Sequence, residues 1–104
     1  MDLNFFKQTR ILDGGMGQEL LARGMKPNGT LWSANAILDE NYHQLLQDTH
    51  RDFIKAGAEV IVTTTFTTRR KRLRENNIED KFEYLNIKAG EIAHKVKKEF
   101  PNFL

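Results

Sequence analysis

The strongest constraint on this chain is a β-branched run, residues 60–63, that directly follows an amphipathic helix pattern. The run lacks polar alternation, which is typical of a strand buried on both faces of a parallel sheet. Upstream, apolar residues recur at helical spacing and end before Gly57, the position expected for a helix C-terminal cap. The pattern predicts a helix over about residues 42–56 that leads into a buried strand. Its apolar face comprises Tyr42, Leu45, Leu46, Phe53 and Ala56.

The same alternation occurs on both sides of this pair. Residues 10–13 predict a short first strand, and residues 18–23 predict a short helix with Gly24 as its C-terminal cap. Residues 25–40 are expected to form a loop, because a Pro-Asn-Gly turn signal interrupts any periodicity there. A second long helix is predicted over about residues 78–100, where Pro101 ends it. Its apolar face comprises Leu85, Ala89, Ile92, Ala93, Val96 and Phe100.

Strand, helix, strand, helix in this order predicts an α/β fold with a parallel sheet. Two buried strands do not make a sheet with both faces covered, and Phe103–Leu104 has the pattern of a third strand's start. We therefore expect residues 1–104 to be one partial domain, the first part of a larger α/β protein. A complete barrel takes about 250 residues.

Composition excludes several classes of protein. The 104 residues contain no cysteine, which excludes a disulfide framework, a thiolate nucleophile and a cysteine-ligated metal within the chain. No apolar run approaches the ~20 residues that span a bilayer, and no signal peptide is visible. These features predict no membrane association and a cytoplasmic location.

A glycine-rich turn, residues 13–17, follows the first predicted strand and is the most informative stretch. It places the Asp13 carboxylate at the end of a strand, where parallel α/β proteins form their active sites. Glycines allow close approach of a ligand to the main chain. The alternative is a tight turn with positive φ, in which Asp13 is a cap. The spacing lacks the third glycine of a dinucleotide fingerprint.

Threonines and then basic residues follow the second predicted strand. The hydroxyls of residues 63–68 can reach a ligand above a sheet, or they reflect only strand propensity and capping. Residues 69–104 hold ten Lys and Arg against six Asp and Glu, with the excess mainly in residues 69–74. Such a run can bind phosphates, or it is a solvated surface.

Four ordered motifs carry a family resemblance: residues 11–20, 31–34, 50–61 and 63–66. Together they resemble the homocysteine S-methyltransferase family. The resemblance implies a (β/α)8 barrel, of which this chain would be the N-terminal two βα units, incomplete after the second helix. It also implies transfer of a methyl group from a donor to the thiol of homocysteine. In the family, a zinc ion held by cysteines activates that thiol.

The resemblance further implies roles for individual residues. Asp13 would bind the substrate ammonium, Trp32 would lie on a loop covering the site, and Thr65 would sit at the rim of the second strand. The backbone of Gly14, Gly15 and Gly17 would line the amino-acid end of the pocket. Thr64 departs from the family pattern, because many members have asparagine there.

The zinc ligands are the second departure. The family's cysteines lie in parts that this chain lacks, and its three histidines do not replace them. His43 and His50 are two helical turns apart, about 10.5 Å, and His94 lies on the other helix. We therefore expect no metal, no catalytic residue and no activity in the isolated chain.

Other partners and functions stay open. Homocysteine and a methyl donor would bind if a partner chain supplied the remaining βα units. The alternatives are a small basic module that binds a polyanion, or one piece of a split barrel. Nucleic acid is the less favoured partner, since aromatic residues are missing from residues 69–74.

Overall fold

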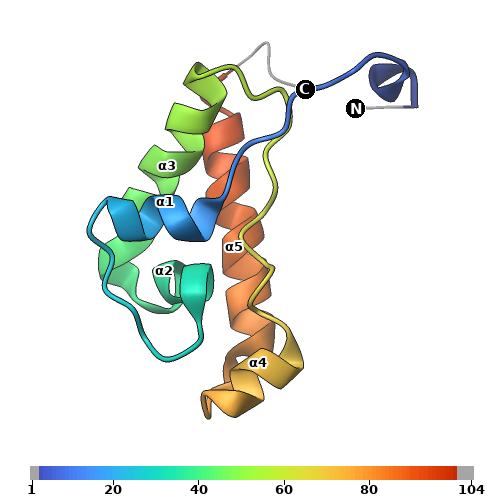
Figure 1. Cartoon of the computed structure of the whole chain (residues 1–104). Coiled ribbons are helices and arrows are strands. Elements are labelled where there is room, and N and C mark those ends of the chain that lie inside the picture. Colours follow the sequence, from blue (N-terminus) through green and yellow to red (C-terminus); the bar gives the residue numbers. More distant parts are fainter. Residues whose placement is uncertain (1–2, 101–104) are drawn as a thin grey trace.

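The computed structural model describes residues 3–100, and within that range its regular elements are helical (Figure 1). The α-helices are α1 (Met16–Ala22), α2 (Asn35–Leu38), α3 (His43–Lys55), α4 (Arg70–Glu75) and α5 (Phe82–Lys97). Short 3₁₀ helices are η1 (Leu3–Lys7), η2 (Trp32–Ala34), η3 (Glu40–Tyr42) and η4 (Glu79–Lys81).

The expectation of an α/β fold, two βα units of a (β/α)8 barrel, is wrong for the part of the chain that the structure describes. The two predicted strands are extended segments that meet in one isolated parallel bridge, Leu12–Val60. The N–H of Asp13 donates to the Val60 carbonyl (3.1 Å), and the N–H groups of Glu59 and Val60 donate to the Ile11 carbonyl (2.7 and 3.2 Å). Two paired segments alone are at most marginally stable as a sheet.

Exposure explains why the pairing stops at one bridge. Ile11 is 59% exposed, Leu12 58% and Val62 55%. A strand buried on both faces needs neighbouring strands and covering helices. Residues 3–100 provide neither for these side chains. The third predicted strand, Phe103–Leu104, lies outside the described residues.

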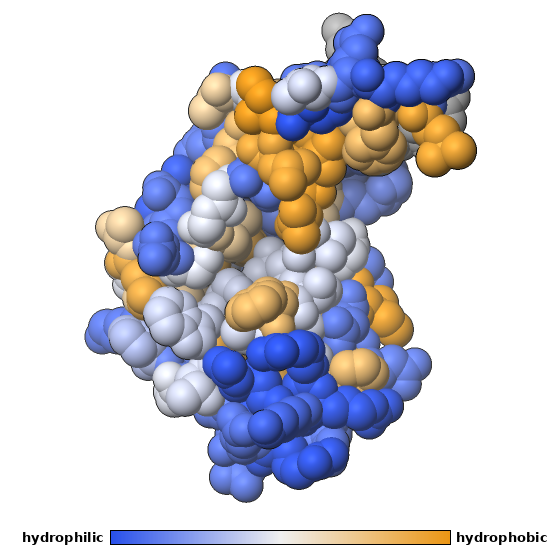
Figure 2. Space-filling model, turned by 45° about the vertical axis from the view of Figure 1, so that its right-hand side comes forward, coloured by the Kyte–Doolittle hydropathy of each residue, from blue (hydrophilic) through white to orange (hydrophobic). Residues whose placement is uncertain are grey.

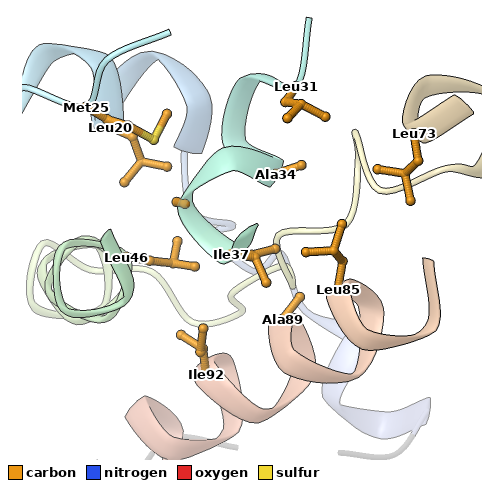
Figure 3. Close-up of a cluster of buried hydrophobic side chains, with 11 residues drawn as sticks. Leu20, Met25, Leu31, Ala34, Ile37, Leu46, Leu73, Leu85, Ala89 and Ile92 are labelled. Carbon is orange, nitrogen blue, oxygen red and sulfur yellow. The ribbon is translucent and has the colours of Figure 1, made fainter. Parts of the chain in front are cut away.

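The core instead lies among the helices (Figure 3). α3 and α5 lie side by side, α1 packs on α3, and α2 packs on both α3 and α5 (Figure 1). Five of the six residues of the predicted face of α5 are confirmed, since Leu85, Ala89, Ile92, Ala93 and Val96 are buried. The sixth, Phe100, lies after the end of α5 at Lys97 and is half-buried, and Pro101, the expected stop, lies outside the described residues. On α3, Leu46 is fully buried, whereas Ala56 is exposed. The main cluster consists of Leu20, Met25, Leu31, Ala34, Ala36, Ile37, Leu46, Leu73, Leu85, Ala89 and Ile92.

The expected loop, residues 25–40, contains two of the helical elements, η2 and α2, and fills the centre of the core. Ala34, Ala36 and Ile37 are fully buried there. Sequence periodicity missed them because elements of three or four residues are shorter than one helical repeat of the apolar pattern.

Glycines end two helices as expected. Gly24 follows α1 with φ of 104°, and Gly57 follows α3 with φ of 120°. Such positive φ values favour glycine, because other residues meet steric strain there. These two predicted helix ends are therefore confirmed, whereas the second long helix begins four residues later than expected, at Phe82.

Candidate functional site

A cavity of about 780 Å³ lies where the two extended segments meet the start of α1 and η2. Its lining comes from residues 12–18, residues 32–33, residues 62–64 with 66–67, and Arg72. The Leu12–Val60 bridge holds the two extended segments in parallel, and hydrogen bonds from Thr67 to Leu31 and Ala34 hold η2 beside the second segment. The lining thus combines an acidic group, a glycine turn, hydroxyls, two aromatic rings and the basic residue Arg72.

Five of the six predicted site residues line this cavity. They are Asp13, Gly14, Gly15, Gly17 and Trp32. Thr65 lies beside the cavity lining rather than in it, and its hydroxyl contacts that of Thr63 at 3.2 Å. Thr64, which the sequence identified as part of the threonine run and as a departure from the family pattern, is part of the lining.

Asp13 is the one acidic residue of the lining. Its Oδ2 accepts a hydrogen bond from the Val62 N–H at 3.1 Å. Partial burial raises the pKa of this carboxyl, and the hydrogen bonds from Val62 and from its own N–H act in the opposite direction. Asp13 forms no ion pair within residues 3–100. A half-buried carboxylate without a cation can bind a ligand ammonium.

The alternative of Asp13 as a helix cap is not what the structure shows. The N-cap of α1 is Gly15, and no side chain caps that helix. The turn also forms without positive φ at Gly14, Gly15 or Gly17. Asp13 instead ties the two extended segments together through Val62.

Position 14 lies close to α3, so a side chain there would require the tip of the Phe53 ring to shift. A Cβ atom at Gly14 would lie 2.9 Å from Phe53 Cε1, closer than real Cβ contacts. At Gly17 a Cβ would stand 3.6 Å from the Trp32 ring, which is ordinary contact. The bare backbone of Gly14 therefore lets the turn pack directly on α3.

Trp32 combines an unusual backbone with an exposed ring. Its φ is 52°, a left-handed conformation that is rare for a bulky residue and costs of order 1–3 kcal/mol. The side chain is 52% exposed at the cavity wall. Phe66, 75% exposed, is the second aromatic ring of the lining. Two such rings can cover an apolar part of a ligand.

The neighbouring threonines have structural partners. Thr67 Oγ1 donates to the Leu31 carbonyl (2.5 Å) and accepts from the Ala34 N–H (3.1 Å). Thr68 Oγ1 bonds Asn86 of α5 at 2.7 Å. These bonds fasten the second extended segment to η2 and α5, so part of the threonine run is explained by packing.

His50 is a residue whose importance the sequence did not reveal. It lies on α3, is fully buried, and its Nε2 is 3.4 Å from Thr64 Oγ1. Burial lowers the pKa of His50 to about 4. His50 lies on the buried side of α3, next to Thr49. The only sequence signal for this position was its helical spacing from the apolar residues of α3.

The basic run forms α4 and its flank, at the hydrophilic lower end in Figure 2. Arg70 stacks over the Phe82 ring at 4.1 Å, and Arg72 Nη1 donates to the Thr30 carbonyl at 2.7 Å. Arg74 pairs with Glu79 at 2.8 Å. These contacts hold α4 to its neighbours, so they give the polyanion-binding alternative no support.

The described residues do not fit a zinc site. Within residues 3–100, no group of three or more His, Cys, Asp or Glu residues could hold a metal ion. His43 Nε2 bonds the Ile37 carbonyl at 2.7 Å, and His50 is enclosed in the protein interior. In the same range, no helix is long and apolar enough to cross a membrane.

Comparison with known proteins gives a consistent picture. The model of the homocysteine S-methyltransferase family matches residues 10–103. No solved structure matches the chain significantly.

Named relatives agree with the family match. Homocysteine S-methyltransferase 2 of Saccharomyces cerevisiae is 34% identical over 90 residues, which cover 78% of this chain and 28% of that protein. Homocysteine S-methyltransferase 2 of Zea mays is 32% identical over 91 residues, covering 86% of this chain and 26% of that protein. Homocysteine S-methyltransferase of Escherichia coli is 36% identical over 56 residues, 54% of this chain and 17% of that protein. The chain thus spans about a quarter of the length of the first two. It belongs to the homocysteine S-methyltransferase family.

Proposed function

We propose that the cavity binds homocysteine, and that the chain takes part in methyl transfer to the homocysteine thiol. Family membership supports the substrate. The observation that carries the proposal is the Asp13 carboxylate, which lines the cavity and has no ion-pair partner within residues 3–100. Homocysteine offers an ammonium that such a carboxylate can bind.

The chain's own residues bind and orient the substrate in this proposal. Asp13 accepts hydrogen bonds from the ammonium, and the backbone of Gly14, Gly15 and Gly17 lines the amino-acid end. Trp32, with its exposed ring, covers the apolar methylene chain. A contact between Thr65 and the substrate stays a prediction, because Thr65 is not among the residues that line the cavity.

No step of the proposal passes through zinc. The donor set within residues 3–100 does not fit that metal, and the chain has no cysteine. We therefore assign substrate binding to this chain and leave the activation of the thiol to other groups.

We also propose that a partner chain completes the reaction. The relatives extend well beyond the matched region, which supports this. Ile11, Leu12 and Val62 are more than half exposed along the bridged segments. Figure 2 shows hydrophobic residues gathered on this side of the molecule. A partner that covered these side chains would remove apolar surface from water.

Homocysteine binding to the full 104-residue chain tests the proposal, measured by isothermal titration calorimetry under a reductant. Asp13→Asn should weaken binding about ten- to hundredfold, because a hydrogen bond to a charged partner contributes about 1.5–3 kcal/mol. The matched control is Asp80→Asn, an exposed carboxylate outside the cavity, which should bind like the wild type.

A second ligand sharpens the assignment. 4-Mercaptobutanoate is homocysteine without the ammonium, so wild-type protein should prefer homocysteine and Asp13→Asn should lose that preference. Unchanged homocysteine affinity in a folded Asp13→Asn protein would refute the role of Asp13. Lack of any homocysteine binding by the wild-type chain would refute the binding proposal itself.

A further inference from the structure

A buried imidazole lies directly behind the cavity wall. His50 of α3 is fully buried, and its Nε2 stands 3.4 Å from Oγ1 of Thr64, which lines the cavity. The other ring nitrogen, Nδ1, is buried with no hydrogen-bond partner. Within residues 3–100, the Thr64 hydroxyl has no second partner. His50 and Thr64 thus share one hydrogen bond. Nδ1 of His50 and the remaining hydrogen-bonding capacity of the Thr64 hydroxyl are unused within the described residues.

The tautomer of His50 decides what Thr64 offers to a ligand. A neutral imidazole carries one hydrogen, on Nδ1 or on Nε2. With the hydrogen on Nδ1, a buried N–H would be left without an acceptor, and Thr64 would donate to Nε2. With the hydrogen on Nε2, the ring donates to Thr64 Oγ1, and the hydroxyl hydrogen of Thr64 stays available. Orphaned buried N–H groups are rarer than underused acceptors, which favours the second arrangement.

We propose that His50 is a positioning residue that keeps its hydrogen on Nε2 and thereby makes Thr64 a hydrogen-bond donor to the cavity. The acceptor is the carboxylate of a bound amino acid. The identity of that ligand rests on the proposed function, whereas the arrangement of His50 and Thr64 does not. Asp13 and Thr64 then recognise the two opposite charges of one amino acid from two neighbouring extended segments.

The surroundings of His50 keep its ring neutral. The ring is fully enclosed, and no carboxylate pairs with it within residues 3–100. Burial without a counter-charge disfavours the imidazolium. A charged ring would carry hydrogens on both nitrogens and would leave Nδ1–H buried without an acceptor.

The first experiment needs no ligand. The ¹⁵N shifts of the His50 ring in the full chain, recorded from pH 5.5 to pH 8, report which nitrogen carries the hydrogen. We expect a protonated Nε2, an unprotonated Nδ1 and no titration in this range. Thr64→Val should alter the Nε2 shift. A hydrogen on Nδ1, or an ordinary titration near pH 6.5, would overturn the proposal whether or not the chain binds homocysteine.

The second experiment uses variants of His50 whose side-chain amide groups reach the place of one ring nitrogen or of the other. In His50→Gln the side-chain amide nitrogen can reach the place of Nε2, whereas in His50→Asn it reaches only that of Nδ1. We expect homocysteine affinity within about threefold of wild type for His50→Gln, and about tenfold weaker for His50→Asn and Thr64→Val. The double variant His50→Asn/Thr64→Val should bind no more weakly than Thr64→Val, because both changes remove one donor.

A truncated ligand separates positioning from general damage. 3-Aminopropane-1-thiol is homocysteine without the carboxylate, so Thr64→Val and His50→Asn should bind it as well as wild type does. Equal losses for both ligands would mean that the variants merely disturb the fold, and would overturn the proposal. If wild-type chain binds neither ligand, the proposed function and the carboxylate contact fail together, and the ring shifts still decide the role of His50.

Discussion

The helical core and the extended cavity face contrast in how completely they are packed. Leu46 of α3 and Leu85 of α5 are fully buried, and both belong to the hydrophobic cluster drawn in Figure 3. Leu12 and Val62 of the cavity face are also large apolar side chains, but they are more than half exposed. The difference teaches that apolar residues become core only where the same chain supplies the covering surface. Helices of this chain supply it for each other, and the bridged segments have no such cover within residues 3–100.

The largest expected effect breaks the packed region. Leu46→Ala should destabilise the protein by about 2–5 kcal/mol, because it removes a fully buried side chain and leaves a cavity between α1, α2 and α5. Urea denaturation followed by circular dichroism measures the change. A loss below about 1 kcal/mol would show that this cluster is not a tightly packed core.

The next effect comes from the buried histidine between the two regions. The pKa of His50 is lowered from 6.5 to about 4, so the unfolded state binds a proton at a higher pH than the folded state. The free energy of unfolding that depends on a neutral His50 is fully present above pH 6.5 and is lost as the pH falls toward 4. The total change is about 3 kcal/mol.

His50→Gln isolates that contribution. Other groups titrate in the same range, so the comparison is the difference in the slope of unfolding free energy against pH between wild type and variant. Wild type should lose more stability between pH 6.5 and pH 4.5. Parallel curves would show that the imidazole is accessible to protons in the folded state.

A smaller effect concerns the contact between the regions. Gly14→Ala should destabilise the protein by roughly 1–3 kcal/mol, since the new Cβ would stand 2.9 Å from the Phe53 ring of α3. Gly15→Ala is the matched control, because its nearest neighbour is Gln18 Oε1 at 3.8 Å. Thermal unfolding of both variants measures the difference. Equal melting temperatures would mean that the turn moves freely against α3.

The smallest expected effect is on the exposed face. Leu12→Thr should change the free energy of unfolding by less than about 0.5 kcal/mol, as is usual for exposed positions. The same urea denaturation as for Leu46→Ala applies. A destabilisation comparable with that of Leu46→Ala would erase the contrast, and would mean that the cavity face is packed in solution.

Part of the candidate site was accessible from sequence. Asp13, the glycine turn and Trp32 were identified from motifs, and the structure brings them to one cavity. The proximity of Thr64 and His50 was not, because it depends on the side of α3 that faces the second extended segment. Thr65, one position away, was chosen instead, and alternate residues of an extended segment point to opposite sides.

The sequence by itself determined the long helices, the glycines that end α1 and α3, and the family. These follow from local periodicity, backbone freedom and short motifs, which act over a few residues. Only the tertiary structure decided that the two predicted strand segments form a single bridge instead of a sheet, and that residues 33–37 fill the core. A strand's hydrogen bonds and covering surface come from distant parts of a chain, so a local pattern can favour a strand that its surroundings do not complete.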